Sequence, residues 1–203
     1  MKNAIKILEV VLFPFFVIIF ISSCRNTSRK ESDSFTNIPV TLPYKFKKIE
    51  AERLSVKAFN LRKTKEYDAA IHLYHKAIEI EPDNPKLFFD LSSCYFETNK
   101  LKQAISVLDT AIILDSTCAT CYSNRGLYYY NLYEDSIAIN DLNKAIELDS
   151  GNYVYYSNIA LAYYSNKKIN QACESFRKAK KLGLKINSAT EQTDLIEIEK
   201  ICN

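Results

Sequence analysis

Small and apolar residues recur along this chain with a fixed period of 34 residues. In the stretch 138–149, AINDLNKAIELD, the residues Ala138, Leu142 and Ala145 are spaced i, i+4 and i+7, so they share one narrow face of a helix. Because two of the three are alanines, another helix is expected to approach this face closely. The equivalent sets elsewhere are Ala70, Tyr74 and Ala77; Ala104, Leu108 and Ala111; and Ala172, Phe176 and Ala179. A repeat of this length predicts stacked helical units.

The period defines four units, at 51–84, 85–118, 119–152 and 153–186. Scarce glycine (3) and proline (5) favour long helices within them. The predicted first helices lie near 47–63, 85–97, 119–132 and 153–165, and the second near 67–80, 101–114, 135–148 and 169–181. A ninth helix is predicted near 189–201, after a cap at Asn187-Ser188. We expect residues 187–203 to form a capping helix that shields the end of the stack.

The units resemble the tetratricopeptide repeat, a helix–turn–helix of 34 residues with small or aromatic residues at set positions. Position 8 is small in every unit, positions 20 and 27 are alanine, and positions 4, 11 and 24 are bulky. The proline that this family has at position 32 is present only as Pro82. The resemblance implies an all-α fold, a right-handed superhelix of about four units over 47–186 with the capping helix behind it.

Residues 1–23 have the pattern of a signal peptide. Lys2 and Lys6 precede an apolar core of thirteen residues, 10–22, which is short for a membrane span of about 20 residues. The core ends in ISSC, which resembles the lipobox of bacterial lipoproteins and implies cleavage before Cys24, with acyl chains such as palmitate on that cysteine. The alternative is an uncleaved anchor. Residues 24–46 are polar and predict a disordered tether.

The lipobox resemblance implies a location in the bacterial cell envelope, with a lipid as the contact to the membrane. Arg25, and not an aspartate, follows Cys24, which slightly favours the outer membrane over the inner one.

In the tetratricopeptide repeat family, the first helix of each unit lines a concave groove. The resemblance implies a partner-binding groove lined by Phe59, Arg62, Lys86, Phe89, Asp90, Phe96, Asn124, Leu127, Tyr130, Asn158, Leu161 and Tyr164. Large apolar side chains with polar neighbours are typical of interaction surfaces. The amides of Asn124 and Asn158 are expected to bond an extended peptide. For any single residue, the alternative is an ordinary surface or packing role.

Family members that bind chaperone C-termini use Lys and Asn at positions 5 and 9 of one unit, Asn at position 6 of the next, and Lys and Arg at positions 2 and 6 of the third. Here the corresponding residues are Ser55, Phe59, Asp90, Thr120 and Asn124, or, one unit later, Phe89, Ser93, Asn124, Val154 and Asn158. The cations that would bind a carboxylate are absent, so this class of ligand is not expected.

The cysteines allow several interpretations. Cys118 and Cys121 form a C-x-x-C motif at a unit boundary, for which we weigh a local disulfide, two free thiols and, as a weak option, redox chemistry. Cys94 and Cys173 fall inside predicted helices and are interpreted as packing residues. Cys202 has no assigned role.

The composition does not indicate a catalytic or nucleic-acid-binding function. The net charge of +3 is too small to be typical of a nucleic-acid-binding protein. His72 and His75 lie three residues apart, but no nearby ligand completes a metal site, so a solvated face is the preferred interpretation. No nucleophile–base pair or phosphate loop is present, so neither an enzyme, a metal nor a cofactor is expected.

The sequence therefore predicts a membrane-tethered scaffold that binds a protein or peptide segment in its groove. The alternative is a structural or assembly subunit that acts by self-association or through its convex face. A third and weaker hypothesis is thiol redox chemistry at the C-x-x-C motif.

Overall fold

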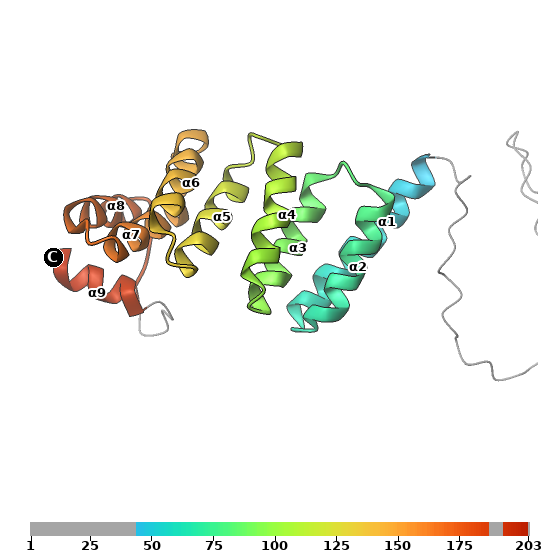
Figure 1. Cartoon of the computed structure of the whole chain (residues 1–203), viewed down its shortest axis with the longest axis horizontal. Helices are drawn as coiled ribbons and strands as arrows, with labels where there is room; N and C mark the ends of the chain where they lie inside the picture. Colours follow the sequence, from blue (N-terminus) through green and yellow to red (C-terminus); the bar gives the residue numbers. More distant parts are fainter. Residues whose placement is uncertain (1–43, 187–192, 203) are drawn as a thin grey trace, which may run out of the picture. The chain divides into compact units, whose positions relative to one another are not determined.

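The computed structural model describes residues 44–186 and 193–202, and this part of the chain is helical throughout, with no strand (Figure 1). The helices are α1 Tyr44–Lys63, α2 Tyr67–Ile80, α3 Pro85–Glu97, α4 Leu101–Leu114, α5 Ala119–Asn131, α6 Asp135–Leu148, α7 Tyr153–Ser165, α8 Ile169–Lys181 and α9 Thr193–Cys202. Helices α1–α8 form four antiparallel pairs that stack side by side in chain order, as the 34-residue period predicts. The described part of the chain is thus an all-helical solenoid with a capping helix.

The alanine stripe brings neighbouring helices into close contact. Ala138, Leu142 and Ala145 of α6 are fully buried, as are the alanines at the same positions of α2 and α4. Opposite them lies Gly126 of α5, where a Cβ atom would come within 2.8 Å of Leu142 Cγ and 3.0 Å of the Ala138 carbonyl oxygen. The glycine is therefore required because α5 and α6 leave no space for a side chain.

The turn inside each unit repeats one backbone conformation. Lys65, Asn99, Tyr133 and Lys167 all have positive φ, between 58° and 65°, and all stand at position 15 of their units. In each case the amide of the following residue donates to a carbonyl five residues back, as Lys100 N does to Tyr95 O at 2.8 Å. This is the Schellman arrangement, which ends the first helix and sets the direction of the second.

Helix α1 begins three residues earlier than predicted. The prediction of a tether as far as residue 46 is wrong for Tyr44, Lys45 and Phe46, because they form the first turn of α1. Residues 44–50 contain neither glycine nor proline, and their lysines and glutamate lose little side-chain entropy in a helix. A solvated helix turn and a polar tether have the same composition, so the pattern did not separate them.

Some predictions lie outside the described residues. These are the signal peptide 1–23, Cys24 with the tether as far as residue 43, and the cap at Asn187-Ser188. The ninth helix is described from Thr193 to Cys202, one residue beyond its predicted end. Among the described helices none is both long and apolar enough to span a membrane.

Helix α9 is covalently linked to α8. Cys173 and Cys202 form a disulfide with a Cα–Cα distance of 5.2 Å, so the interpretation of Cys173 as a packing residue is wrong. The two cysteines are 29 residues apart, and Cys202 lies outside the repeat pattern, so the period gave no reason to pair them. A loop of this size closed by a disulfide stabilises a fold by about 3–4 kcal/mol in the chain-entropy model.

Candidate functional site

The candidate site is the groove formed by the first helices α1, α3, α5 and α7. One hollow in it has a volume of about 320 Å³ and is lined by Phe96, Leu127, Tyr130, Asn131, Leu161, Thr193 and Asp194. Phe96, Leu127, Tyr130 and Leu161 come from three successive units and were all predicted as groove residues. The period therefore brings together apolar side chains that are far apart in the sequence.

Helix α9 forms the remaining wall of this hollow. The Tyr130 hydroxyl donates to Asp194 Oδ2 at 2.7 Å, across 64 residues of sequence. The Tyr164 hydroxyl donates to Glu197 Oε2 at 2.9 Å. Burial is the main cause of the raised pKa of Tyr130, and the bond to the Asp194 carboxylate adds to it. For Tyr164, the hydrogen bond to Glu197 is the first cause of the raised pKa. Both tyrosines therefore stay protonated as donors.

Three predicted groove residues are almost fully buried. Asp90 is 6% exposed and accepts a hydrogen bond from Lys86 Nζ at 2.6 Å. Asn158 is 5% exposed, and its amide donates to Ser123 Oγ at 3.3 Å, so it is not free for a peptide. Position 6, which both residues occupy, lies at the contact between neighbouring first helices. Leu161 is buried for a different reason, because α9 covers it.

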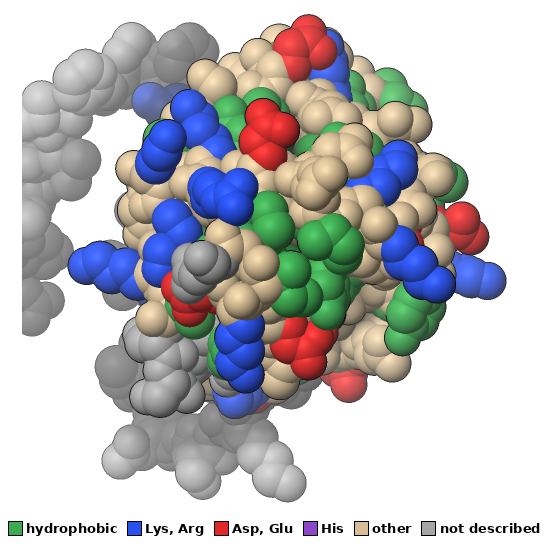
Figure 2. All heavy atoms as spheres, turned by 90° about the vertical axis from the view of Figure 1, so that its left-hand side faces the viewer, with side chains coloured by type: hydrophobic (Ala, Val, Ile, Leu, Met, Phe, Trp, Pro, Cys, Tyr) green, Lys and Arg blue, Asp and Glu red, His purple; other side chains and the backbone are tan. Residues whose placement is uncertain are grey.

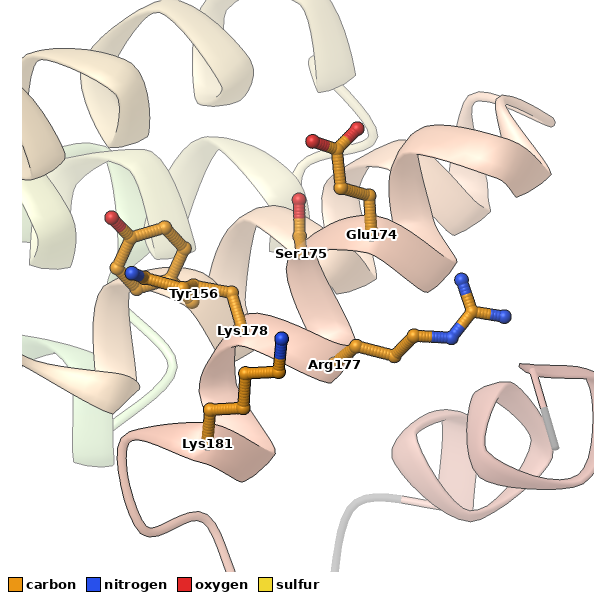
Figure 3. A pocket seen from close by; sticks show the side chains of 6 residues that line it. All are labelled: Tyr156, Glu174, Ser175, Arg177, Lys178 and Lys181. Carbon is orange, nitrogen blue, oxygen red and sulfur yellow. The ribbon is translucent and has the colours of Figure 1, made fainter.

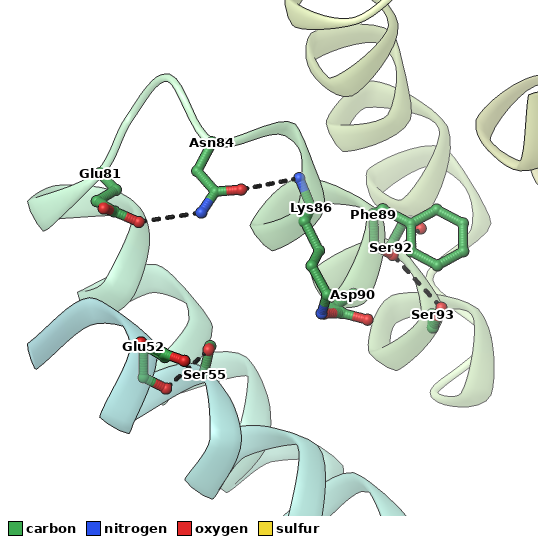
Figure 4. Close-up of polar contacts among 9 residues, drawn as sticks. All are labelled: Glu52, Ser55, Glu81, Asn84, Lys86, Phe89, Asp90, Ser92 and Ser93. Carbon is green, nitrogen blue, oxygen red and sulfur yellow. Dashed lines mark hydrogen bonds and ion pairs between the residues drawn. The ribbon is translucent and has the colours of Figure 1, made fainter. Parts of the chain in front are cut away.

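Among the described residues, α9 packs on α7 and α8 and not on the helices in the half of the groove near the N-terminal end of the stack. Phe59 of α1 is partly exposed, with the Arg62 guanidinium 5.2 Å and the Lys63 ammonium 4.5 Å from its ring centroid. Phe89 of α3 is also partly exposed, and Figure 4 shows it on the same helix as the Lys86–Asp90 pair. Aromatic rings beside cations give this half an apolar surface with positive charge around it.

Local capping sets the direction of α3 in this half. Asn84 accepts a hydrogen bond from the Lys86 amide at 3.2 Å and donates to Glu81 at 3.0 Å (Figure 4). Pro85 follows at the first helical position, where its missing N–H costs nothing. Farther along, Phe96 stacks on the buried ring of Tyr128 of α5, with centroids 4.7 Å apart. Phe96 therefore has both a packing role and a groove role.

The C-x-x-C motif forms a local disulfide. Cys118 and Cys121 are bonded, and the Cys118 sulfur also accepts the Cys121 amide at the start of α5. This arrangement caps the N-terminus of α5. Cys94 is a free thiol buried in the core, and burial raises its pKa to about 11, so it is a poor nucleophile.

The two histidines both lie on α2. His75 Nε2 lies 2.8 Å from the Tyr95 hydroxyl, and His72 is exposed. Within residues 44–186 and 193–202, no group of three His, Cys, Asp or Glu side chains is arranged to hold a metal ion.

A second hollow lies on α7 and α8 and not on the groove. It has a volume of about 490 Å³ and is lined by Tyr156, Glu174, Ser175, Arg177, Lys178 and Lys181 (Figure 3). The Lys178 ammonium is 5.8 Å from the Tyr156 ring centroid. In the view onto the C-terminal end of the stack, a central group of hydrophobic side chains is surrounded by Lys and Arg side chains with several Asp and Glu among them (Figure 2). The surface at this end therefore has an apolar middle and a charged border.

Sequence reasoning missed three residues that line the groove hollow: Asn131, Thr193 and Asp194. Asn131 stands at position 13, a groove position in the resembled family, so the period was sufficient to find it. Thr193 and Asp194 belong to α9, and no repeat position assigns them to the groove. The disulfide between Cys202 and Cys173, which links α9 to α8, is known only from the structure.

Known proteins share this architecture. Residues 61–120 and 153–182 match family models described as tetratricopeptide repeat. The crystal structure of MamA is 26% identical, covers 65% of this chain and 77% of its own, and has a TM-score of 0.61. MamA from residue 41 to its end, from Desulfovibrio magneticus RS-1, is 13% identical, covers 75% of this chain and 81% of its own, and has a TM-score of 0.64.

A third similar structure contains a ligand. It is the first TPR of Spaghetti (RPAP3) bound to the HSP90 peptide SRMEEVD, which is 27% identical, covers 59% of this chain and 95% of its own, and has a TM-score of 0.58. Both matched family models describe a repeat and neither describes a catalytic domain. The repeated positions, the stacked helix pairs and these matches agree that this chain contains tetratricopeptide repeats.

Proposed function

We propose that this protein is a membrane-tethered scaffold whose groove binds a segment of a protein partner. The observation that carries the proposal is the apolar side on which Phe59 of α1 and Phe89 of α3 stay partly exposed, together with the hollow of about 320 Å³ formed by the units that follow. A few side chains, often aromatic, supply most of the binding energy of a typical protein interface. The partly exposed ring of Phe59, with its two cations, lies at the first-unit end of this surface.

The structure of RPAP3 with its peptide supports peptide binding by this type of repeat, but the same ligand is not proposed here. The positions that hold cations in chaperone-binding members carry Ser55, Thr120 and Asn124 in this chain or, one unit later, Phe89, Val154 and Asn158. We propose instead a segment that presents apolar side chains to the aromatic groove.

Site-specific cross-linking tests the groove. A photoreactive phenylalanine analogue at position 59 or 89 is expected to capture a partner in intact cells, whereas the same analogue at 113 or 133 is not. Ile113 and Tyr133 are 82% and 87% exposed and are not groove positions, so they control for exposure alone. Phe89→Ala should lower capture from position 59 by about fivefold, because one aromatic anchor is lost. Equal capture from all four positions would remove the groove from the proposal.

The tether part of the proposal depends on Cys24. Its support is the lipobox sequence ISSC after a thirteen-residue apolar core, and two or more acyl chains hold a protein firmly on a membrane. Cys24→Ser is expected to move the protein from the membrane fraction to the soluble fraction. Cys94→Ser is the matched control and should stay with the membrane. A Cys24→Ser protein of unchanged mass that stays in the membrane would indicate an uncleaved anchor.

One observation favours self-association as a second candidate function. Phe46, Ile49 and Val56 of α1 are 57%, 52% and 54% exposed, and their spacing places them on one side of the helix. This apolar side lies on α1, the first helix of the described part of the stack. A stable oligomer that withholds the groove positions from cross-linking would favour this second function over the first.

A further inference from the structure

Helix α9 occupies the part of the groove formed by the third and fourth units. Tyr130 and Tyr164 stand at position 12 of these units, and each donates a hydrogen bond to a carboxylate of α9. Leu161, at position 9 of the fourth unit, is 2% exposed because α9 packs on it. A cap that only shielded the end of the stack would leave these positions open.

The sequence of α9, TDLIEIEKIC, combines apolar residues on one side with acidic residues beside them, as in amphipathic helices that bind in grooves. Leu195, Ile198 and Cys202 are spaced i, i+3 and i+7 and are buried against α7 and α8. Asp194 and Glu197 lie beside this apolar side and reach the two tyrosines. This half of the groove is thus already shaped for an acidic amphipathic helix.

The contacts that fix the other end of α9 come from α8. Cys202 is disulfide-bonded to Cys173, and its carbonyl oxygen accepts a hydrogen bond from Arg177 at 2.9 Å. Lys180 forms an ion pair with Glu199 at 2.8 Å. A helix of ten residues is marginal on its own, and an ion pair with both partners partly exposed adds little. The position of α9 is therefore expected to depend on the disulfide.

We propose that α9 is a disulfide-held occupant of this half of the groove, and that the partner which replaces it is an acidic amphipathic helix with the carboxylate and apolar pattern of α9. The proposal rests on the function proposed above and adds the class of partner and a condition for binding. With the disulfide intact, α9 fills the site. After reduction, α9 detaches and the site accepts a partner helix.

The redox step requires a dithiol reductant. Its thiolate attacks the Cys202 sulfur, the S–S bond breaks, and the Cys173 sulfur leaves and takes up a proton. The second thiol of the reductant then attacks the mixed disulfide and releases Cys202 as a thiol, so the reductant loses two electrons and two protons and becomes a disulfide. Cys202 lies in the last turn of α9, beside Ile201, which is 52% exposed, so opening one helix turn gives access to the sulfur.

The test uses the full chain in detergent and a fluorescent peptide with the sequence of residues 193–202, in which Cys202→Ser prevents disulfide exchange. Fluorescence anisotropy measures binding before and after dithiothreitol. The reduced protein should bind about tenfold more tightly than the oxidised one, because the open fraction of the groove rises. Cys202→Ser protein should bind at the reduced level with or without dithiothreitol. Since this variant keeps Cys118 and Cys121, it excludes an effect of reductant at that disulfide.

Two variants in the Cys202→Ser background test the location. Tyr130→Phe with Tyr164→Phe should weaken peptide binding by about fivefold, because two bonds to carboxylates are lost. Tyr133→Phe changes an exposed tyrosine that makes no contact with α9 and should have no effect. Circular dichroism checks that each variant remains helical. Equal binding by oxidised and reduced protein, or loss of binding with Tyr133→Phe alone, would overturn the proposal.

The outcomes separate this proposal from the one on which it rests. If reduction leaves peptide binding unchanged while capture from position 59 still depends on Phe89, the role of α9 is wrong and the groove function stands. If the peptide binds on reduction but no partner is captured from positions 59 and 89, the α9 site stands and the proposed function of the other half of the groove is wrong.

Discussion

Replacing Arg125 with methionine is expected to lower the free energy of unfolding by about 3 kcal/mol, because the change leaves a carboxylate buried without its cation. Arg125 of α5 donates to both Asp141 oxygens at 2.7 Å and to Asp109 at 2.7 Å. The side chains of Arg125 and Asp141 are 19% and 10% exposed. The hydrogen bond to Asp141 is the first cause of the raised pKa of Arg125, so the guanidinium stays charged and the loss should be the same at pH 6 and pH 9.

Urea unfolding followed by helical circular dichroism measures this effect as a shift of the midpoint. Asp109→Asn is the matched control, because Asp109 is 47% exposed and its part of the network should contribute less than about 1 kcal/mol. Arg125→Met combined with Asp141→Leu should recover most of the loss, since neither charge then remains buried. If Arg125→Met costs no more than Asp109→Asn, the α4–α5–α6 contact does not depend on this pair.

The helix positions were predictable because one period encodes them. The bounds of α2, α3, α4, α6, α7 and α8 coincide with the predicted ranges, since position 8 and the alanines at positions 20 and 27 repeat without insertion. Helix α5 ends at Asn131, one residue before its predicted end. Where no repeat precedes or follows, the period gives no guidance. The first turn of α1 and the position of α9 both lie outside the four units, and both needed the structure.

The groove residues within the four units were also predictable from the 34-residue period. Phe96, Leu127 and Tyr130 stand at positions 9 and 12, which face the groove in any stack of these units, and the structure brings them together. Asp90 and Asn158 stand at position 6, whose burial depends on how closely the neighbouring first helices pack. That distance is a result of packing over the whole interface, which a single-residue pattern does not contain.

The burial of Leu161 by α9 shows a second limit. The repeat pattern predicts which side chains of a unit face the groove. It does not predict which of them a segment outside the repeats will cover. Cys173 and Cys202 connect a repeat position to a segment without a repeat, and only their proximity at a Cα–Cα distance of 5.2 Å identifies the pair. The accessible part of the groove is therefore set jointly by the units and by the segment that follows them.

Replacing Gly126 with leucine is expected to lower the free energy of unfolding by about 3 kcal/mol, since an overpacked contact forces helices apart. Gly126 stands at position 8, where the other units carry Ala58, Ser92 and Ala160, all fully buried. A Cβ atom fits at those three positions but would lie 2.8 Å from Leu142 Cγ here. Gly126→Ala should therefore cost about 1 kcal/mol, although alanine in a helix interior is normally better than glycine by a similar amount.

Gly151→Ala is the control for the glycine substitution itself. Its Cβ would be 3.4 Å from Asp149 Oδ1 in an exposed turn, so its effect should stay within about 0.5 kcal/mol. Leu142→Ala should reduce the cost of Gly126→Ala but not remove it, because the Ala138 carbonyl oxygen still lies 3.0 Å from the new Cβ. A Gly126→Ala protein at least as stable as the original would show that α5 and α6 separate at no cost. The alanine stripe of α6 would then mark the repeated position in each unit, but it would not determine the distance between α5 and α6.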